Sequence, residues 1–165
     1  MAIELTELNK VFEVEHGSKL DLNKMEECSS LTKDAVAFIG RSGERNGLRA
    51  FVRRLDDKEP YDAALISVAL GGSALSSFVQ PQPFYTAQNI DVLRPRAEMS
   101  LDVKLFYCLC IEANRFRYST FGREANRTLK TLLVPTLKSV PAWVDGAIER
   151  AASALYRDVA AVAES

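Results

Sequence analysis

Basic and aromatic side chains gather in one short stretch of this 165-residue chain, residues 115–130. The stretch holds five basic residues against one acid, Glu124, with aromatic residues interleaved and a turn at Gly122. Arginine presents a planar fork of donors that matches phosphate oxygens and the acceptor edge of guanine, and asparagine can pair with adenine. These residue types favour nucleic-acid recognition. The predicted contacts in this stretch are Arg115, Arg117, Tyr118, Arg123, Asn126, Arg127 and Lys130.

A second polar segment, GRSGERNG at residues 40–47, separates two apolar runs. Asn46-Gly47 is a dipeptide typical of tight hairpin turns, so the segment is predicted to be a hairpin tip. Its side chains can face a nucleic acid or form an ordinary exposed turn, and both interpretations stay open. The further candidates lie after Gly17 and after a pair of prolines, where an edge strand is the alternative. The predicted contacts outside residues 115–130 are Lys19, Arg41, Ser42, Arg45, Asn46, Tyr85 and Gln88.

The charge that would bind a polyanion is local, because the whole chain has a net charge of −1. Residues 1–34 carry four basic and eight acidic side chains, whereas residues 94–130 carry eight and four. A balance of this kind predicts one basic face and excludes nonspecific wrapping of nucleic acid over the whole surface. The three cysteines, two of them in an apolar run, are typical of reduced thiols in a cytoplasmic protein. We expect no membrane partner, since no run is long enough to span a bilayer.

The elements that must position these residues are short strands followed by helices. Alternating or apolar runs bounded by turn residues predict strands near residues 11–15, 36–39, 48–52, 64–70, 74–80, 90–93 and 131–134. Ser100 is a suitable N-cap for a helix from Leu101 to about Phe116. The face predicted to pack on the core is mostly apolar and consists of Leu101, Leu105, Cys108, Leu109 and Glu112. This order predicts an α+β fold, a small mixed or antiparallel sheet domain with packed helices and a long C-terminal helix.

That last helix, residues 141–165, is rich in alanine and follows a domain of residues 1–140. Its larger apolar residues recur at intervals of three and four, which draws a single stripe along a helix. The stripe either folds back on the domain or pairs with a helix of another subunit. The predicted dimerisation or docking residues are Val144, Ile148, Ala151, Leu155, Val159 and Val162.

In this order and spacing, the chain resembles the target-recognition domain of the DNA-specificity (S) subunits of type I restriction–modification systems. The resemblance covers nearly the whole length. It is carried by several segments together: LNKVFEVEHGSKL (residues 8–20), VAFIGRSGERNGLRAFV (36–52), FYTAQNIDVLRP (84–95), KLFYCLCIEANRFRYSTFGREANRTLKTLLVP (104–135) and the proline-led helix after Val140.

The resemblance implies a subunit that reads one half of a split target in double-stranded DNA and docks a DNA adenine-N6 methyltransferase subunit. Full specificity subunits carry two such domains, so this chain resembles a half-subunit. It would then form a homodimer through the C-terminal helix or accompany a separate methyltransferase polypeptide. A symmetric dimer would read a palindromic split site. S-adenosylmethionine would be the cofactor of the partner, and none is expected on this chain.

The sequence predicts no catalytic site. The Asn/Asp-Pro-Pro-aromatic motif that such a methyltransferase needs is absent, as are glycine-rich nucleotide fingerprints. The lone histidine and Cys108-x-Cys110 do not make a metal-ligand pattern. Two alternatives remain. The chain could be an assembly module whose basic patch is incidental, or a nuclease that uses Asp102 and Lys104, although no partner acid is evident.

Overall fold

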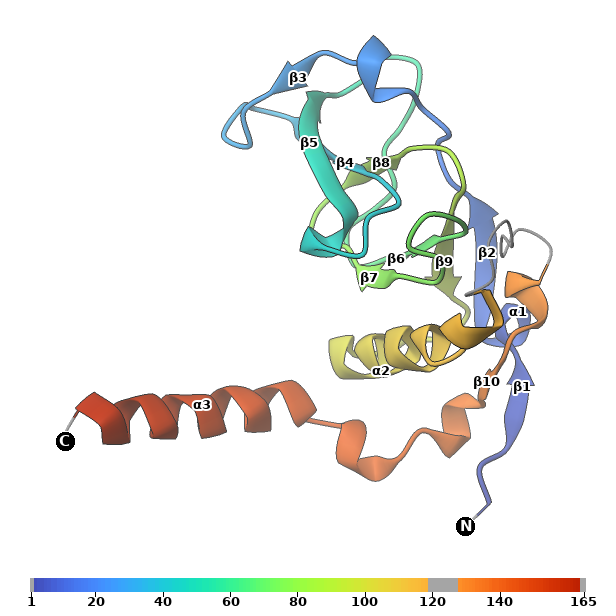
Figure 1. The fold of residues 1–165 in the computed structure, drawn as a ribbon, viewed down its shortest axis with the longest axis vertical. Coiled ribbons are helices and arrows are strands. Elements are labelled where there is room, and N and C mark those ends of the chain that lie inside the picture. The colour runs from blue at the N-terminus through green and yellow to red at the C-terminus, as the bar shows by residue number, and fades with distance from the viewer. Residues whose placement is uncertain (1, 119–127, 164–165) are drawn as a thin grey trace.

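The computed structural model describes residues 2–118 and 128–163 of the chain (Figure 1). Its strands are β1 (Leu5–Glu7), β2 (Phe12–His16), β3 (Glu27–Cys28), β4 (Ala35–Ile39), β5 (Leu48–Arg53), β6 (Ile66–Ala69), β7 (Ser77–Val79), β8 (Phe84–Thr86), β9 (Ile90–Pro95) and β10 (Leu133–Pro135). Its α-helices are α1 (Leu8–Val11), α2 (Leu101–Glu112) and α3 (Ala147–Ala163). Short 3-10 turns are η1 (Leu22–Lys24), η2 (Arg45–Gly47), η3 (Arg115–Tyr118), η4 (Leu129–Thr131), η5 (Leu137–Ser139) and η6 (Ala142–Val144).

One antiparallel sheet, in the order β2-β9-β6-β7, packs against α2. Its middle strands are apolar and buried because the sheet is covered on both faces, by α2 and by the rest of the domain (Figure 1). Leu93 of β9 stands opposite both Val14 of β2 and Ile66 of β6. Together with Tyr107 and Ile111 of α2, this sheet forms the larger apolar core.

The second sheet, in the order β3-β5-β4-β8, lies on the far side of the first sheet from α2 (Figure 1). Its β4–β5 hairpin is the one predicted from Asn46-Gly47, and both turn residues have positive φ, 55° and 74°. β8 follows Pro83 and pairs with β4 in parallel at the edge of this sheet, which confirms the edge strand that was the alternative after the two prolines. The prolines precede the ladder and do not break it, because the Pro83 carbonyl still accepts from the Ala37 amide at 3.2 Å.

The N-terminal strand β1 pairs with β10, near the other end of the domain. Thr6 stands opposite Val134, and the Leu8 amide donates to the Leu132 carbonyl at 2.8 Å. Residues 5–7 are extended because β10 takes their hydrogen bonds, and α1 starts at Leu8. The domain is therefore closed by a two-stranded ladder that joins its two ends.

The core face of α2 differs from the predicted one. Cys108, on the predicted face, is buried together with Tyr107 and Ile111, whereas Leu101, Leu105 and Leu109 of that face are exposed. Apolar residues occur on almost every side of this helix, so periodicity alone could not choose between the faces. Tertiary contacts decide: Tyr107 packs edge-to-face on Phe12, with ring centroids 5.2 Å apart, and its hydroxyl donates to the Pro135 carbonyl. The predicted N-cap is confirmed, since the Ser100 hydroxyl accepts from the Val103 amide.

The long helix α3 runs out from the sheets, and its far end projects beyond the rest of the domain (Figure 1). None of its described residues is buried, so its apolar stripe stays exposed. The helix starts at Ala147, later than predicted, because Val144 lies before it in η6 and is buried. Val144, which the sequence placed in the stripe, therefore packs in the domain and does not lie on the exposed face of α3. The fold class predicted from the sequence is confirmed.

Candidate nucleic-acid interface

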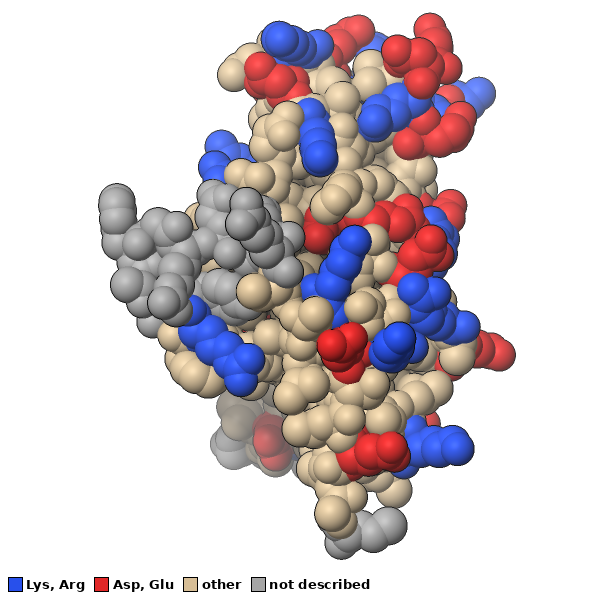
Figure 2. Space-filling model, turned by 90° about the vertical axis from the view of Figure 1, so that its right-hand side faces the viewer, with Lys and Arg blue, Asp and Glu red and all other residues tan. Residues whose placement is uncertain are grey.

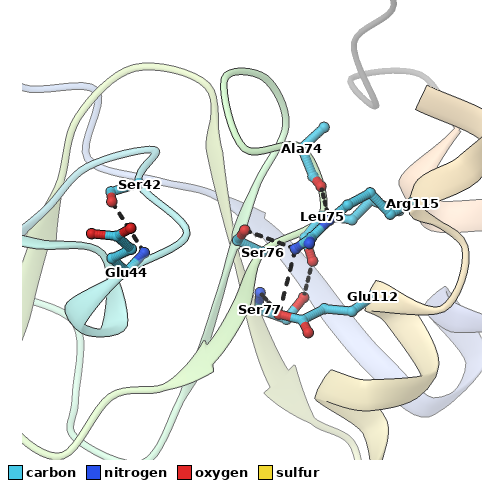
Figure 3. A network of polar contacts seen from close by, with 8 residues as sticks. All are labelled: Ser42, Glu44, Ala74, Leu75, Ser76, Ser77, Glu112 and Arg115. Carbon is cyan, nitrogen blue, oxygen red and sulfur yellow. Dashed lines mark hydrogen bonds and ion pairs between the residues drawn. The ribbon is translucent and has the colours of Figure 1, made fainter. Parts of the chain in front are cut away.

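The hairpin tip at residues 40–47 and Arg115, the first residue of the other predicted segment, lie on either side of the β6–β7 loop, residues 70–76 (Figure 3). On one side the Ser73 amide donates to the Arg41 carbonyl at 3.2 Å. On the other side the Arg115 guanidinium donates to the Ala74 carbonyl at 3.1 Å and to the Ser76 hydroxyl at 3.0 Å. One small serine-rich loop thus sets the distance between the hairpin tip and the turn that follows α2.

Arg115 holds this loop. Its guanidinium also lies 3.8 Å from Glu112, whose carboxylate accepts from the Ser77 amide at 3.1 Å (Figure 3). Arg115 is therefore engaged with the protein, although about half of its side chain is exposed. Arg117, two residues later, is exposed and lies over the ring of Phe116, 5.7 Å from its centroid.

The hairpin tip presents its side chains from a fixed backbone. Arg45 and Asn46 both have positive φ, and the Asn46 carbonyl accepts from the buried Gln80 amide at 2.9 Å. The Ser42 hydroxyl accepts from the Glu44 amide, so Ser42 holds the turn together. The side chains of Arg41, Arg45 and Asn46 remain exposed. A tip that is held in this way loses little conformational entropy when it binds.

A cleft of about 870 Å³ opens beside the hairpin and brings together four cations. They are Lys19, Lys24, Arg41 and Arg49, with Gln88 at the same wall and Asp21 and Asp57 as the acids. Among the described residues, none of the four cations forms an ion pair, whereas Arg53, Arg54 and Arg94 are all paired with carboxylates. The cleft therefore carries uncompensated positive charge, which attracts anions.

Sequence reasoning missed Lys24 and Arg49. Arg49 lies on β5 and crosses over Gly40, where a Cβ would come within 2.7 Å of the Arg49 Cγ atom. A glycine opposite an arginine in a predicted hairpin is a signal that could have revealed it. Lys24 ends the η1 turn, and only the tertiary fold brings that turn to the cleft.

Lys19 and Gln88 are held against each other at the edge of the cleft. The Gln88 amide donates to the Lys19 carbonyl at 2.7 Å, and Lys19 itself has a positive φ of 56°. The preceding residue is fixed as well, because Ser18 and Thr86 exchange two hydrogen bonds between backbone amides and hydroxyls. The structure thus brings Lys19, Arg41 and Gln88, three of the predicted contacts, to one surface.

Other predicted contacts lie elsewhere. Tyr85 is fully buried, and its hydroxyl donates to the Lys58 carbonyl and accepts from the Leu55 amide. Tyr85 is a core residue, so the prediction that it contacts a ligand is wrong. Lys130 is exposed on η4, which packs on α1 and away from the cleft. Tyr118 ends η3, while the predicted contacts Arg123, Asn126 and Arg127 lie outside the described residues.

One face of the molecule carries mixed charges. The face seen in Figure 2 carries acidic and basic side chains intermingled along its length. One group on β2 and β9 shows the pattern: Arg94 donates to Glu15 at 2.8 Å and lies 3.5 Å from Asp62. The Glu15 hydrogen bond raises the pKa of Arg94. Such a face offers no sustained attraction to a polyanion.

The pair suggested for a nuclease has structural roles. The Asp102 carboxylate accepts from the Gly146 and Ile148 amides, and the Lys104 ammonium donates to the Ala64 carbonyl. Over residues 2–118 and 128–163, no group of three or more histidine, cysteine or acidic side chains is arranged to hold a metal ion. The same residues contain no helix long and apolar enough to cross a membrane.

The chain is similar to restriction–modification specificity subunits. It is 25% identical over 139 residues to S.BcgI, the specificity subunit of a type II restriction enzyme of Heyndrickxia coagulans. The aligned region covers 82% of this chain and 39% of that relative. Its fold matches the type I S subunit from M. genitalium, with a TM-score of 0.58 at 16% identity over 82% of this chain and 34% of that one. It also matches the HsdS subunit from Thermoanaerobacter tengcongensis, with a TM-score of 0.61 at 15% identity over 94% of this chain and 39% of that one.

This chain therefore spans about two fifths of the curated relative and a similar part of the solved subunits. No family model matches it. The resemblance predicted from the sequence, to a specificity-subunit target-recognition domain, is confirmed by these similarities.

Proposed function

We propose that this chain, a target-recognition domain of the specificity-subunit type, reads a DNA sequence on behalf of a partner enzyme. The cleft beside the β4–β5 hairpin is the observation that carries the proposal. Four cations without ion pairs among the described residues surround it, and the rigid hairpin tip stands at its rim. Lysine and arginine contacts to phosphate would position the domain, while exposed tip side chains such as Arg45 and Asn46 would reach base edges.

In this proposal the chain carries out no chemical step. The partner would be a DNA adenine methyltransferase subunit that binds S-adenosylmethionine, and both would act in the cytoplasm. The similarity to specificity subunits supports this division of roles. The exposed stripe of α3 would join two copies into a homodimer or dock the partner, since none of the described residues of this helix is buried in the domain.

Charge neutralisation in the cleft gives the test. Arg41→Gln combined with Arg49→Gln removes two of the four cations without altering a described ion pair. We expect DNA affinity to fall and the slope of log affinity against log salt to shrink by about 0.9 for each phosphate that is no longer neutralised. The matched control is Arg53→Gln with Arg54→Gln, which removes two exposed arginines that are already paired with Glu26 and Glu59.

Binding is measured by fluorescence anisotropy on labelled duplex DNA over a range of salt concentrations. An unchanged salt slope in the cleft variant, or an equal loss of affinity in the control, would remove the cleft from the interface. Arg123→Ala and Arg127→Ala test the segment outside the described residues. If either side chain reads a base, its removal costs about 1–3 kcal/mol and relaxes specificity at that position.

A further inference from the structure

His16, at the end of β2, is held by a buried carboxylate. Its Nδ1 atom lies 2.9 Å from Oδ1 of Asp91, the residue directly opposite on β9. The Asp91 side chain is 3% exposed, whereas the His16 side chain is 62% exposed. A buried carboxylate needs a donor, and His16 supplies one from the surface. The imidazole is thereby oriented with Nδ1 inward and Nε2 toward solvent.

The backbone that carries His16 is fixed from three directions. The Tyr61 hydroxyl donates to the His16 carbonyl at 2.6 Å, and the Gly17 amide donates to the Ile90 carbonyl at 2.9 Å. Ser18, next in the chain, is tied to Thr86 by two hydrogen bonds. The exposed edge of the ring therefore has a defined position.

That edge belongs to the same surface as the cleft. A hollow of about 200 Å³ is lined by His16, Asp91, Asn89 and Lys19, and Lys19 also lines the cleft. The Leu70 amide, at the start of the β6–β7 loop, donates to the Asn89 carbonyl at 2.9 Å. His16 thus lies where the cleft meets the loop that separates the hairpin tip from Arg115.

The direction of the Nδ1–H bond determines what the ring can offer. When the ring is neutral, Nδ1 carries the proton toward Asp91 and Nε2 is an acceptor, which repels a phosphate oxygen. When the ring is protonated, Nε2–H becomes a charged donor and Asp91 balances the added charge. An anion at this edge therefore favours the imidazolium form.

We propose that His16 is a phosphate contact of the DNA interface and that it takes up a proton as DNA binds. This inference rests on the proposed function and adds one named residue to it. The charged and titratable groups around the ring are Asp91 from β9, Lys19 from the following loop and the Tyr61 hydroxyl. Glu15, one residue earlier on β2, is paired with Arg94.

His16→Asn gives the sharpest variant. The asparagine amide can take the place of Nδ1 and keep a donor for Asp91, while Nε2 and the titratable charge are removed. His16 is the single histidine of the chain, so no other side chain is expected to change charge across neutral pH in the same way. The control is Lys138→Gln, which removes one exposed cation on η5, outside the cleft.

The full chain is titrated onto duplex DNA of mixed sequence, over a range of salt concentrations, at about pH 6 and about pH 8. We expect wild type and Lys138→Gln to bind several-fold more tightly at the lower pH, with a salt slope larger by about 0.9 there. His16→Asn should show neither change. Thermal unfolding at both pH values confirms that each variant is folded.

A His16→Asn variant that keeps the wild-type pH dependence would overturn the assignment of His16 and leave the proposed function standing. A wild type that binds without any pH dependence would overturn it equally. A folded wild type that fails to bind the duplex at either pH and at low salt would overturn both. The two failures are therefore distinguishable.

Discussion

Gly17 occupies a position that has room for a hydrogen atom and little else. A Cβ there would overlap the Thr86 hydroxyl and lie 2.6 Å from the Ile90 carbonyl oxygen. The neighbouring backbone cannot yield easily, since it is tied by the hydrogen bonds between Ser18 and Thr86. A small residue is therefore required where β2 leaves its sheet.

Gly17→Ala is expected to destabilise the fold by about 1–3 kcal/mol, because an overpacked site must shift its backbone. Urea unfolding measures the change. Gly43→Ala is the matched control, since its nearest neighbours are the Ser76 and Ser73 hydroxyl oxygens at 3.1 and 3.3 Å. The control should lose less stability. Equal losses in the two variants would mean that crowding of the Cβ atom does not explain the destabilisation by Gly17→Ala.

Two buried groups on α2 link stability to alkaline pH. Burial, with a smaller contribution from Glu112, raises the pKa of Cys108 from 9.0 to about 12, and burial raises the pKa of Tyr107 from 10.0 to about 12. Both groups are therefore held neutral in the folded state. Their contribution to stability is fully present below about pH 9 and is lost as pH rises toward 12.

The free energy of unfolding should therefore fall between about pH 9 and pH 12, by up to about 1.4 kcal/mol per pH unit for each group. Cys108→Ala should reduce this alkaline loss, although it also removes core volume at every pH. Cys28→Ala, at a partly exposed cysteine outside the core, should leave the loss unchanged. Denaturant titrations at several pH values measure this loss. An equal alkaline loss of stability in Cys108→Ala and Cys28→Ala would contradict the explanation.

At the scale of elements, the contacts between α2 and the start of α3 determine how α3 is attached to the domain. Asp102, in the first turn of α2, accepts from the Gly146 amide at 3.2 Å and the Ile148 amide at 2.9 Å. Phe106, one turn later on α2, packs edge-to-face on Trp143 with centroids 6.1 Å apart. Since α3 has no buried residue of its own, these contacts set the direction in which it leaves the domain.

Asp102→Ala should free the start of α3, because the first amides of the helix lose their acceptor. We expect faster hydrogen exchange at Gly146 and Ile148 and a loss of about 0.5–2 kcal/mol in helix stability. Asp145→Ala removes an exposed carboxylate next to the joint and should leave the exchange of both amides nearly unchanged. Unaltered exchange in Asp102→Ala would mean that other contacts direct α3.

Local signals were enough to predict elements whose stability depends on residues close in sequence. Asn46-Gly47 predicted the β4–β5 hairpin and Ser100 predicted the start of α2, because a turn and a cap are made by neighbouring residues. The parallel pairing of β8 with β4 and the ladder of β1 with β10 join distant segments. No local pattern encodes such partners, so both were missed.

The same limit applies at the site. Arg41 and Lys19 were predicted as contacts because glycine and polar residues surround them in sequence, and both line the cleft. Tyr85 was placed at the surface because it follows two prolines, yet its hydroxyl is satisfied inside the core by Leu55 and Lys58. Tyrosine has an apolar ring and a polar hydroxyl, so it can lie in the core or at the surface. Only the tertiary structure determines which of the two it does.

At the scale of the whole molecule, the proposed assembly depends on the exposed apolar stripe of α3. Leu155 and Val159 are 65% and 60% exposed, on a helix that has no buried side chain among its described residues. If α3 joins two copies, as proposed, a charge in the stripe would have to be buried at the interface, which is costly.

Leu155→Glu should therefore convert a dimer into a monomer, as measured by sedimentation velocity. Ser153→Glu is the matched control, because it adds the same charge to the opposite side of α3 at an exposed position. The control should stay dimeric. A dimer that survives Leu155→Glu would contradict dimerisation through the α3 stripe. It would indicate that the domain itself forms the interface or that the stripe binds a different partner.

The β1–β10 ladder has a consequence for the order in which the chain folds. Residues 5–7 can find their partners only after residues 133–135 have been made, so this pairing must close a loop that contains nearly the whole domain. Contacts of such long range form slowly and late. We expect α2 and the β6–β7 and β4–β5 hairpins to form first and the ladder to close last. Until β10 has been synthesised, β1 has no partner strand, so β1 is the segment most exposed to mispairing during synthesis.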